Sequence, residues 1–261
     1  MSTPVPIRSP LPTALAGQNV LIVGGSSGIG LAAARLLGAA GAGLLLVARD
    51  ETRLKEAADS LADATPVRTL AADVTDESAL AQAFERAGPL DHVLLTAGAA
   101  ARAPLAEADR SRVQGDFDVR FWGGYATARA AAERLPAGGS ITFMSGVYTV
   151  RPVAGAAAAI ASGAACEGLA RALAVELAPR RVRVNAVRAG IVDTPPLRRR
   201  LGAAAQASDA QADAVVAAAG RHLPLGRFGT AEEAAAAAVF VMANPYVTGS
   251  VVTVDGGQSL A

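Results

Sequence analysis

The sequence predicts a single α/β domain, in which a parallel sheet of about seven strands carries helices on both faces. Short continuous apolar runs alternate with segments whose apolar residues recur at helical spacing, and this alternation is typical of a doubly wound sheet. The 261 residues, of which 52% are hydrophobic, suffice for one large buried core. A glycine-rich turn also joins the first apolar run to the first helical segment.

Most of the expected strands have apolar side chains at consecutive positions. Strands buried on both faces show this pattern, because helices cover both sides of a parallel sheet. Ile29, Ala33 and Leu36 follow the first run at helical spacing. The expected strands are residues 20–23, 44–47, 67–70, 93–95, 141–144, 182–187 and 251–254.

We expect the domain to occupy residues 17–261. Residues 1–16 contain four prolines and no continuous apolar run, so they are expected to form a flexible N-terminal arm. Residues 195–220 combine an arginine run at 198–200 with Ala, Gln and Ser and few large apolar groups. This segment is predicted to be a mobile, partly helical lid.

Composition argues against several classes of partner. A net charge of +1 and an aromatic content of 4% do not favour nucleic-acid binding. We found no apolar run near the ~20 residues that a membrane helix needs, and no secretory signal, so we expect a cytoplasmic protein with no membrane partner. The one cysteine, Cys166, excludes a disulfide framework and a Cys-rich zinc site, and no metal site is expected.

The glycine-rich turn predicts a site for a nucleotide phosphate. Glycines allow the backbone to come close to a pyrophosphate, and the helix that follows presents its N-terminus to the negative charge. A plain strand-to-helix turn would need neither feature. The residues expected to bind the phosphates are Gly24, Ser26, Ser27, Gly28, Ile29 and Gly30.

Several segments together resemble the short-chain dehydrogenases/reductases over about residues 17–258. They are the G-x-x-x-G-x-G spacing from Gly24, the helical stretch 167–178, the RVNAV stretch 183–187 and GSVVTVDGG at 249–257. The resemblance implies a Rossmann-like fold, a nicotinamide cofactor and hydride transfer to or from a carbonyl or alcohol of a small molecule. It also implies a homodimer or homotetramer.

The resemblance assigns further cofactor positions one by one. It places Asp73 and Val74 beside the adenine, with Asp73 accepting from the adenine amino group, although an Asp here also suits a helix cap. Thr194 matches the residue that holds the nicotinamide carboxamide. The other matching cofactor positions are Ala97, Gly98, Gly190 and Val192. Thr96 stands where the family has an Asn that braces the backbone, so that asparagine is missing here.

The end of the second expected strand favours NADP(H) over NAD(H). An acidic residue there would bind the ribose 2′-hydroxyl of NAD. The family position is Ala48, and Arg49 follows it with a guanidinium that suits a 2′-phosphate. Asp50 also lies near this position and leaves NAD(H) as the alternative.

All four catalytic side chains of the family are absent at the matching positions. The family uses a Tyr, a Lys four residues later, a Ser thirteen residues before the Tyr and an Asn on an earlier helix. Ala159, Gly163, Gly146 and Arg120 stand in these places. Neither Ala nor Gly transfers a proton, so ordinary carbonyl reduction should be very slow. The candidates for a replacement role are Ser145, Tyr148, Arg120 and Arg188.

Three functions are compatible with this pattern. The first is an NADP(H)-dependent oxidoreductase with atypical or strongly reduced catalysis. The second is a non-catalytic NADP(H)-binding sensor or partner subunit, and the third is a redox-neutral lyase or cyclase that uses the same pocket. The resemblance assigns Arg120, Arg151 and Arg188 near the pocket, where they could polarise a carbonyl or bind an anionic small-molecule substrate; solvated or structural arginines are the alternative. His92 is expected to be a structural histidine whose ring nitrogens have partners.

Overall fold

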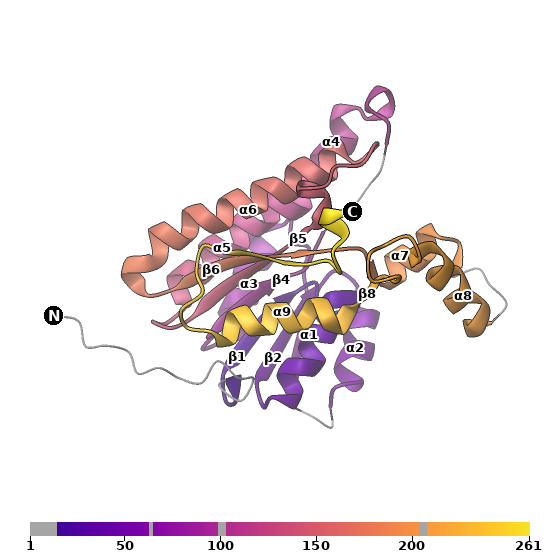
Figure 1. The fold of residues 1–261 in the computed structure, drawn as a ribbon. Coiled ribbons are helices and arrows are strands. Elements are labelled where there is room, and N and C mark those ends of the chain that lie inside the picture. The colour runs from indigo at the N-terminus through magenta and orange to yellow at the C-terminus, as the bar shows by residue number, and fades with distance from the viewer. Residues whose placement is uncertain (1–14, 63–64, 99–102, 204–207) are drawn as a thin grey trace.

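The computed structural model describes residues 15–62, 65–98, 103–203 and 208–261 and has a seven-stranded sheet at its centre (Figure 1). The strands pair in parallel in the order β3-β2-β1-β4-β5-β6-β9. All seven expected strands are confirmed, with ends that differ by no more than two residues. Their bounds are β1 Asn19–Val23, β2 Gly43–Ala48, β3 Val67–Ala71, β4 His92–Leu95, β5 Ser140–Gly146, β6 Arg183–Ala189 and β9 Val251–Val254.

Helices cover both faces of the sheet, as the alternating pattern predicts (Figure 1). One face carries α1 (Gly28–Ala39), α2 (Glu51–Asp59) and α9 (Ala231–Ala243), which share one apolar core with the strands. The other face carries α3 (Glu77–Ala87), α5 (Gly123–Arg134) and α6 (Ala157–Leu177), which share a second core. The fold is therefore a doubly wound, Rossmann-like α/β domain.

Within the described part of the chain, the N-terminus of α1 has no side-chain cap, unlike those of α2, α3 and α9. Asp50 caps α2, Asp76 caps α3, and Thr230 with Glu233 forms a capping box on α9. At α1, the N-cap residue Ser27 makes no side-chain cap bond among the described residues, and the first turn has no acidic residue. The positive end of the α1 dipole therefore faces the carboxyl edge of the sheet without an internal anion.

A π-helical turn interrupts the long helical stretch before β5. It spans Asp118–Trp122 between α4 (Arg110–Phe117) and α5, and its middle residue is Arg120. Such wider turns are uncommon and often occur at functional sites.

The segment expected to be a lid is helical, with α7 at Pro195–Arg200 and α8 at Asp209–Gly220. These helices form a small apolar cluster of their own, which projects beyond the sheet beside β7 (Val192–Asp193) and β8 (Gly229–Thr230) (Figure 1). Motion of this segment stays a prediction. Most of the expected N-terminal arm lies outside the described residues. Leu15 is buried in the core, so the structure places the start of the domain slightly before residue 17.

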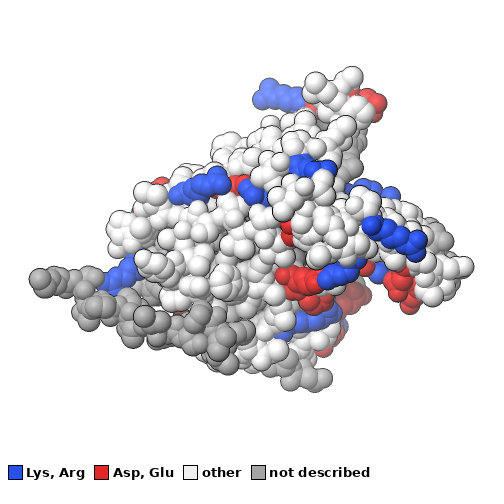
Figure 2. All heavy atoms as spheres, viewed as in Figure 1, with Lys and Arg blue, Asp and Glu red and all other residues white. Residues whose placement is uncertain are grey.

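On the face shown in Figure 2, acidic and basic side chains lie close together and much of the surface carries neither. By length and composition alone, the helical stretch Ala157–Arg180 is apolar enough to cross a membrane. It packs against β5 and β6 here, and a core helix passes the same test. Among the described residues, no group of three or more His, Cys, Asp or Glu side chains is arranged to hold a metal.

His92 lies on β4, buried at the end of the sheet opposite to the glycine-rich turn. Its Nδ1 is 2.7 Å from Ser140 Oγ and its Nε2 is 2.7 Å from Gln18 Oε1, an arrangement that suits the neutral ring. Burial lowers the pKa of His92 to about 3, and the charge of Arg183 lowers it further in the same direction. The geometry matches the expected structural histidine.

We predict that His92 makes the fold sensitive to acid. In the unfolded chain a histidine takes up a proton below about pH 6.5, whereas the folded chain holds His92 neutral down to about pH 3. The unfolded state therefore binds more protons, and the free energy of unfolding falls as the pH drops through this window, by up to about 1.4 kcal/mol per pH unit. Denaturant titrations at several pH values should show that the free energy of unfolding depends less steeply on pH in His92→Gln than in the unmodified protein. The exposed His222 is the only other histidine, so His222→Gln is the matched control and should keep the slope. An equal slope in all three proteins would contradict the prediction.

Candidate functional site

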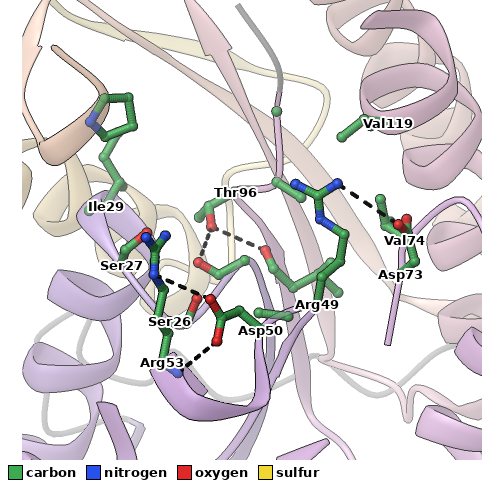
Figure 3. Close-up of a pocket in the computed structure, with 18 of the residues that line it drawn as sticks. Ser26, Ser27, Ile29, Arg49, Asp50, Arg53, Asp73, Val74, Thr96 and Val119 are labelled. Atoms are coloured by element: carbon green, nitrogen blue, oxygen red, sulfur yellow. Dashed lines mark hydrogen bonds and ion pairs between the residues drawn. The ribbon is translucent and has the colours of Figure 1, made fainter. Parts of the chain in front are cut away.

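A cavity of about 420 Å³ lies at the carboxyl ends of β1, β2 and β4, where the glycine-rich turn meets the sheet (Figure 3). Twelve of the residues expected to bind cofactor line it. They are Gly24, Ser26, Ser27, Gly28, Ile29, Gly30, Arg49, Asp73, Val74, Ala97, Gly98 and Thr194.

Thr96 braces the glycine-rich turn against β4. Its hydroxyl lies 3.1 Å from the carbonyl oxygens of both Val23 and Gly24 (Figure 3). Gly24 has a φ of +90°, and a β-carbon there would lie 2.5 Å from Thr96 Oγ1, while a β-carbon on Gly30 would collide with the Gly24 carbonyl. Both positions therefore require glycine. The family's asparagine is absent at this position, and the Thr96 hydroxyl contacts the turn instead.

The carboxylate of Asp50 caps the N-terminus of α2. It accepts from the Arg53 backbone N–H at 3.0 Å and lies 3.4 Å from the Arg53 side chain. Arg49 points from the end of β2 along the cavity wall, largely exposed, with NH1 3.9 Å from an Asp73 oxygen (Figure 3). The other Asp73 oxygen accepts from the N–H and hydroxyl of Thr75. Arg53 also lines the cavity, a position that sequence reasoning missed although it lies four residues after Arg49.

A second cavity of about 490 Å³ adjoins the first and shares six lining residues with it, including Ile29 and Thr194. Three of the catalytic candidates, Arg120, Ser145 and Tyr148, line this cavity. The expected cofactor residues Gly190 and Val192 line it rather than the first cavity. Arg200 from α7 also contributes and was not singled out as a site residue.

The guanidinium of Arg120 lies next to positions where the family's catalytic side chains are expected. A β-carbon on Gly163 would lie 3.9 Å from Arg120 NH1, and one on Gly98 would lie 2.9 Å from Arg120 NH2. Ala159 lines the same cavity. A β-carbon on Gly146 would meet nothing within 4 Å among the described residues. A permanent cation thus lies 3.9 Å from the point where a lysine side chain at position 163 would begin.

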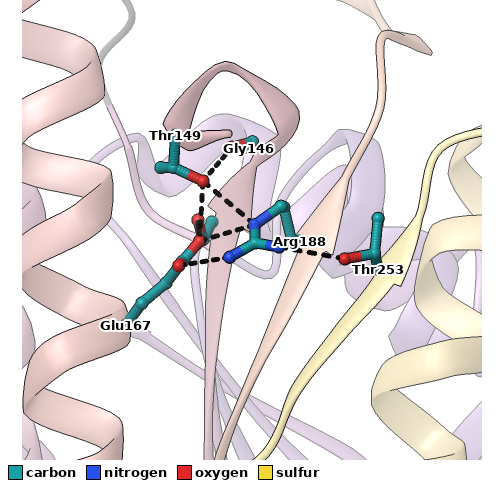
Figure 4. A network of polar contacts seen from close by, with 6 residues as sticks. Gly146, Thr149, Glu167, Arg188 and Thr253 are labelled. Atoms are coloured by element: carbon teal, nitrogen blue, oxygen red, sulfur yellow. Dashed lines mark hydrogen bonds and ion pairs between the residues drawn. The ribbon is translucent and has the colours of Figure 1, made fainter. Parts of the chain in front are cut away.

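Arg188 is not brought to the cavity, which corrects its expected role as a catalytic candidate. Among the described residues, it is absent from the cavity lining, because its guanidinium is bound to Glu167 of α6 (Figure 4). Arg188 Nε lies 2.9 Å from Glu167 Oε1 and NH2 lies 2.6 Å from Oε2, while NH1 contacts the Thr253 hydroxyl at 3.1 Å. Both charged side chains are largely buried.

The Glu167 carboxylate also accepts hydrogen bonds from two hydroxyls. Ser145 Oγ lies 2.6 Å and Thr149 Oγ1 lies 2.9 Å from Glu167 Oε1 (Figure 4). Burial raises the pKa of the carboxyl, but the hydrogen bonds from Arg188, Ser145 and Thr149 outweigh burial and hold that pKa below its usual value. Glu167 is therefore ionised at neutral pH. Sequence reasoning used this residue only as part of a helix pattern.

Comparisons with known proteins agree with this geometry. A family model described as enoyl-(acyl carrier protein) reductase matches residues 23–259. Carbonyl reductase family member 4 of Danio rerio is 34% identical over 248 residues, which are 92% of this chain and 97% of that protein.

Two solved structures are similar over almost the whole chain. L-sorbose reductase from Gluconobacter frateurii, complexed with NADPH and L-sorbose, has a TM-score of 0.87 at 27% identity, covering 96% of this chain and 100% of that one. MalC reductase/Diels-Alderase from Malbranchea aurantiaca has a TM-score of 0.85 at 29% identity, covering 96% and 99%. Since the fold, the glycine-rich turn and the matched residues all agree, the chain belongs to the short-chain dehydrogenase/reductase family.

Proposed function

We propose that this protein is an NADP(H)-dependent oxidoreductase that acts on a carbonyl or alcohol of a small anionic molecule, with Arg120 as a fixed positive charge beside the substrate. The observation that carries the proposal is the position of the Arg120 guanidinium in a cavity that adjoins the cofactor cavity. The NADPH in the related sorbose reductase structure supports the cofactor class.

The residues of the first cavity fit a dinucleotide phosphate. The turn at Ser26–Ile29 and the N-terminus of α1 would hold the pyrophosphate, since no acidic side chain of the first turn opposes it. Arg49 and Arg53 lie on the same wall and would hold a 2′-phosphate. NADPH, when bound, supplies the hydride. Thr194 lines both cavities, so it would hold the nicotinamide end near the substrate.

Arg120 would stabilise negative charge on the substrate, either on a carboxylate or on the oxygen that becomes negative during reduction. A preorganised donor of this kind is worth about 10²–10³ in rate. A guanidinium does not release its proton at neutral pH, so it does not replace the general acid. The proton has to come from water or from the substrate, which is why ordinary ketones should be poor substrates.

The MalC similarity favours a second candidate function, a redox-neutral cyclisation in the same cavity. That relative's name joins a reductase with a Diels-Alderase activity. A fixed cation with no proton relay suits a reaction that needs a polarised carbonyl and no proton transfer. Substrate conversion without a change in NADPH would distinguish this candidate from the first.

We further propose that the protein forms a homodimer or homotetramer through α5 and α6. Trp122, Tyr125 and Val175 are large apolar residues that are 55%, 43% and 77% exposed on this face. Exposed apolar groups gathered on neighbouring helices favour a protein partner, and a second copy fits the proposed assembly.

We expect sedimentation at micromolar concentration to show an oligomer. Tyr125→Arg with Val175→Arg should shift the protein to lower mass, because two charges would be buried at the contact. Replacement of the exposed Phe240 by Arg, on α9 on the opposite face of the sheet, is the control and should leave the mass unchanged. A monomer in the unmodified protein would contradict the assembly.

The cofactor preference should depend on Arg49. We expect NADPH to bind more tightly than NADH, and Arg49→Ala to weaken NADPH binding by about tenfold with little change for NADH. A charged hydrogen bond contributes about 1.5–3 kcal/mol, and the exposure of Arg49 puts it at the lower end. Fluorescence titration measures both affinities. Arg129→Ala, an exposed arginine on α5, is the control. Equal affinities for the two cofactors in the unmodified protein would overturn the assignment.

Reduction of simple ketones with NADPH should be far below the usual turnover of about 1–10³ s⁻¹. Arg120→Met should lower the remaining activity by about 10²–10³ while NADPH affinity stays the same, because the lost cation acts on the substrate. Stopped-flow absorbance of NADPH checks the rate. Turnover in the usual range that survives Arg120→Met would exclude the proposed role.

The same experiment extends to a variant with the family's side chains restored. Ala159→Tyr, Gly163→Lys, Gly146→Ser and Arg120→Asn together should gain ketone reduction, since position 146 has space and the substitution at position 120 makes room for the lysine. NADPH binding without turnover of any substrate in the unmodified protein would favour the non-catalytic sensor or partner subunit.

A further inference from the structure

The hydroxyl of Ser145 donates its hydrogen bond to another residue of the protein. Its oxygen lies 2.6 Å from Glu167 Oε1, and an ionised carboxylate only accepts hydrogen bonds. A serine hydroxyl has one hydrogen, so that hydrogen lies between Ser145 and Glu167. Ser145 also lines the second cavity. Its oxygen therefore presents a lone pair to a ligand in this cavity and can accept a hydrogen bond from it.

Glu167 holds this orientation firmly. Its carboxylate accepts two hydrogen bonds from Arg188, one from Thr149 and one from Ser145, and the glutamate is only 4% exposed. Within the described residues it does not line the cavity, so it acts on a ligand only through Ser145. Thr149 and Thr253 complete the contacts of Arg188 and keep its guanidinium against the carboxylate.

Ser145 and Arg120 are close enough to bind one small ligand together. A β-carbon placed on Gly163 would lie 3.8 Å from Ser145 Oγ and 3.9 Å from Arg120 NH1, so both atoms lie near the same point. Both residues also line the second cavity, so one ligand bound there can reach the acceptor and the cation.

We propose that the Glu167–Arg188 pair positions Ser145 as a hydrogen-bond acceptor, so that the cavity selects α-hydroxy carboxylates over the matching keto acids. The carboxylate would bind Arg120 and the hydroxyl would donate to Ser145. A keto oxygen at the same place would meet a lone pair instead of a donor. This inference rests on the proposed function, which places an anionic substrate in this cavity.

Mandelate and benzoylformate test the selection, because they differ only in the hydroxyl or keto group beside the carboxylate. Calorimetry on the protein loaded with NADP⁺ measures both affinities without reduction of the keto acid. We expect mandelate to bind about three- to tenfold more tightly, the range of one neutral hydrogen bond. Ser145→Ala should bring the two affinities together. Ser162→Ala removes another buried hydroxyl, on α6, and should keep the preference.

A double variant separates positioning from a merely structural role. Glu167→Leu with Arg188→Leu removes both buried charges together, a replacement that proteins often tolerate. The Ser145 hydrogen then has no carboxylate partner and can turn toward the cavity, so the preference should shift to benzoylformate while NADP⁺ affinity stays the same. An unchanged preference for mandelate in this variant would overturn the positioning role.

The unmodified protein distinguishes failure of the inference from failure of the proposed function. If both acids bind equally and Arg120→Met weakens both, the anionic site stands and the role of Ser145 is overturned. If neither acid shows binding that depends on Arg120, the proposed function fails and the inference fails with it. NADP⁺ binding measured in parallel confirms that each variant is folded.

Discussion

The ion pair between Glu167 and Arg188 is the interaction on which the second cavity, at the carboxyl ends of the strands, depends. It ties α6 to the carboxyl ends of β5, β6 and β9, through Ser145, Arg188 and Thr253. Removing two charges from water costs several kcal/mol, which an attraction offsets only where the geometry is good. Here all four hydrogen bonds to the carboxylate are between 2.6 and 2.9 Å, so the cost is well compensated. The position of α6 in turn sets where Ala159 and Gly163 face the cavity.

The two adjoining cavities depend on different kinds of chemical group. The cofactor cavity relies largely on backbone N–H groups, on glycines that leave room for a phosphate, and on a helix dipole, and these survive many side-chain changes. Thr96 illustrates this tolerance, because a threonine hydroxyl braces Gly24 where the family uses an asparagine. Proton transfer depends on particular side chains instead. The fold and the cofactor cavity are intact with Ala159, Gly163, Gly146 and Arg120 at the four positions matched to the family's catalytic residues.

Most of the fold could be predicted from the sequence, because strands buried on both faces give apolar runs that are hard to mistake. The end of the second strand placed Arg49 beside the first cavity, and the resemblance to the family placed Arg120 beside the second. The direction of Arg188 could not be predicted in this way. Its position on β6 puts it near the cavity, but a carboxylate on α6, distant in sequence, decides where its guanidinium points.

Arg53 and the π-helical turn were missed for a related reason. Arg53 reaches the cofactor cavity because α2 begins at Asp50, and its side chain looks in sequence like any exposed helix residue. The π-helical turn depends on how α4 and α5 pack, and no residue type marks it. Sequence patterns therefore predicted the helices, the strands and the edge of the sheet where the cavities lie. The hydrogen-bond partners of the side chains, and the directions in which the side chains point, required the tertiary structure.

The guanidinium of Arg120 has a consequence for the evolutionary history of this site. It stands within 4 Å of the point where a β-carbon on Gly163 would lie, so a lysine at that position would begin beside a permanent positive charge while the arginine remains. The order of mutations thus matters, since a reversion at position 163 alone would bring two cations together in a confined space.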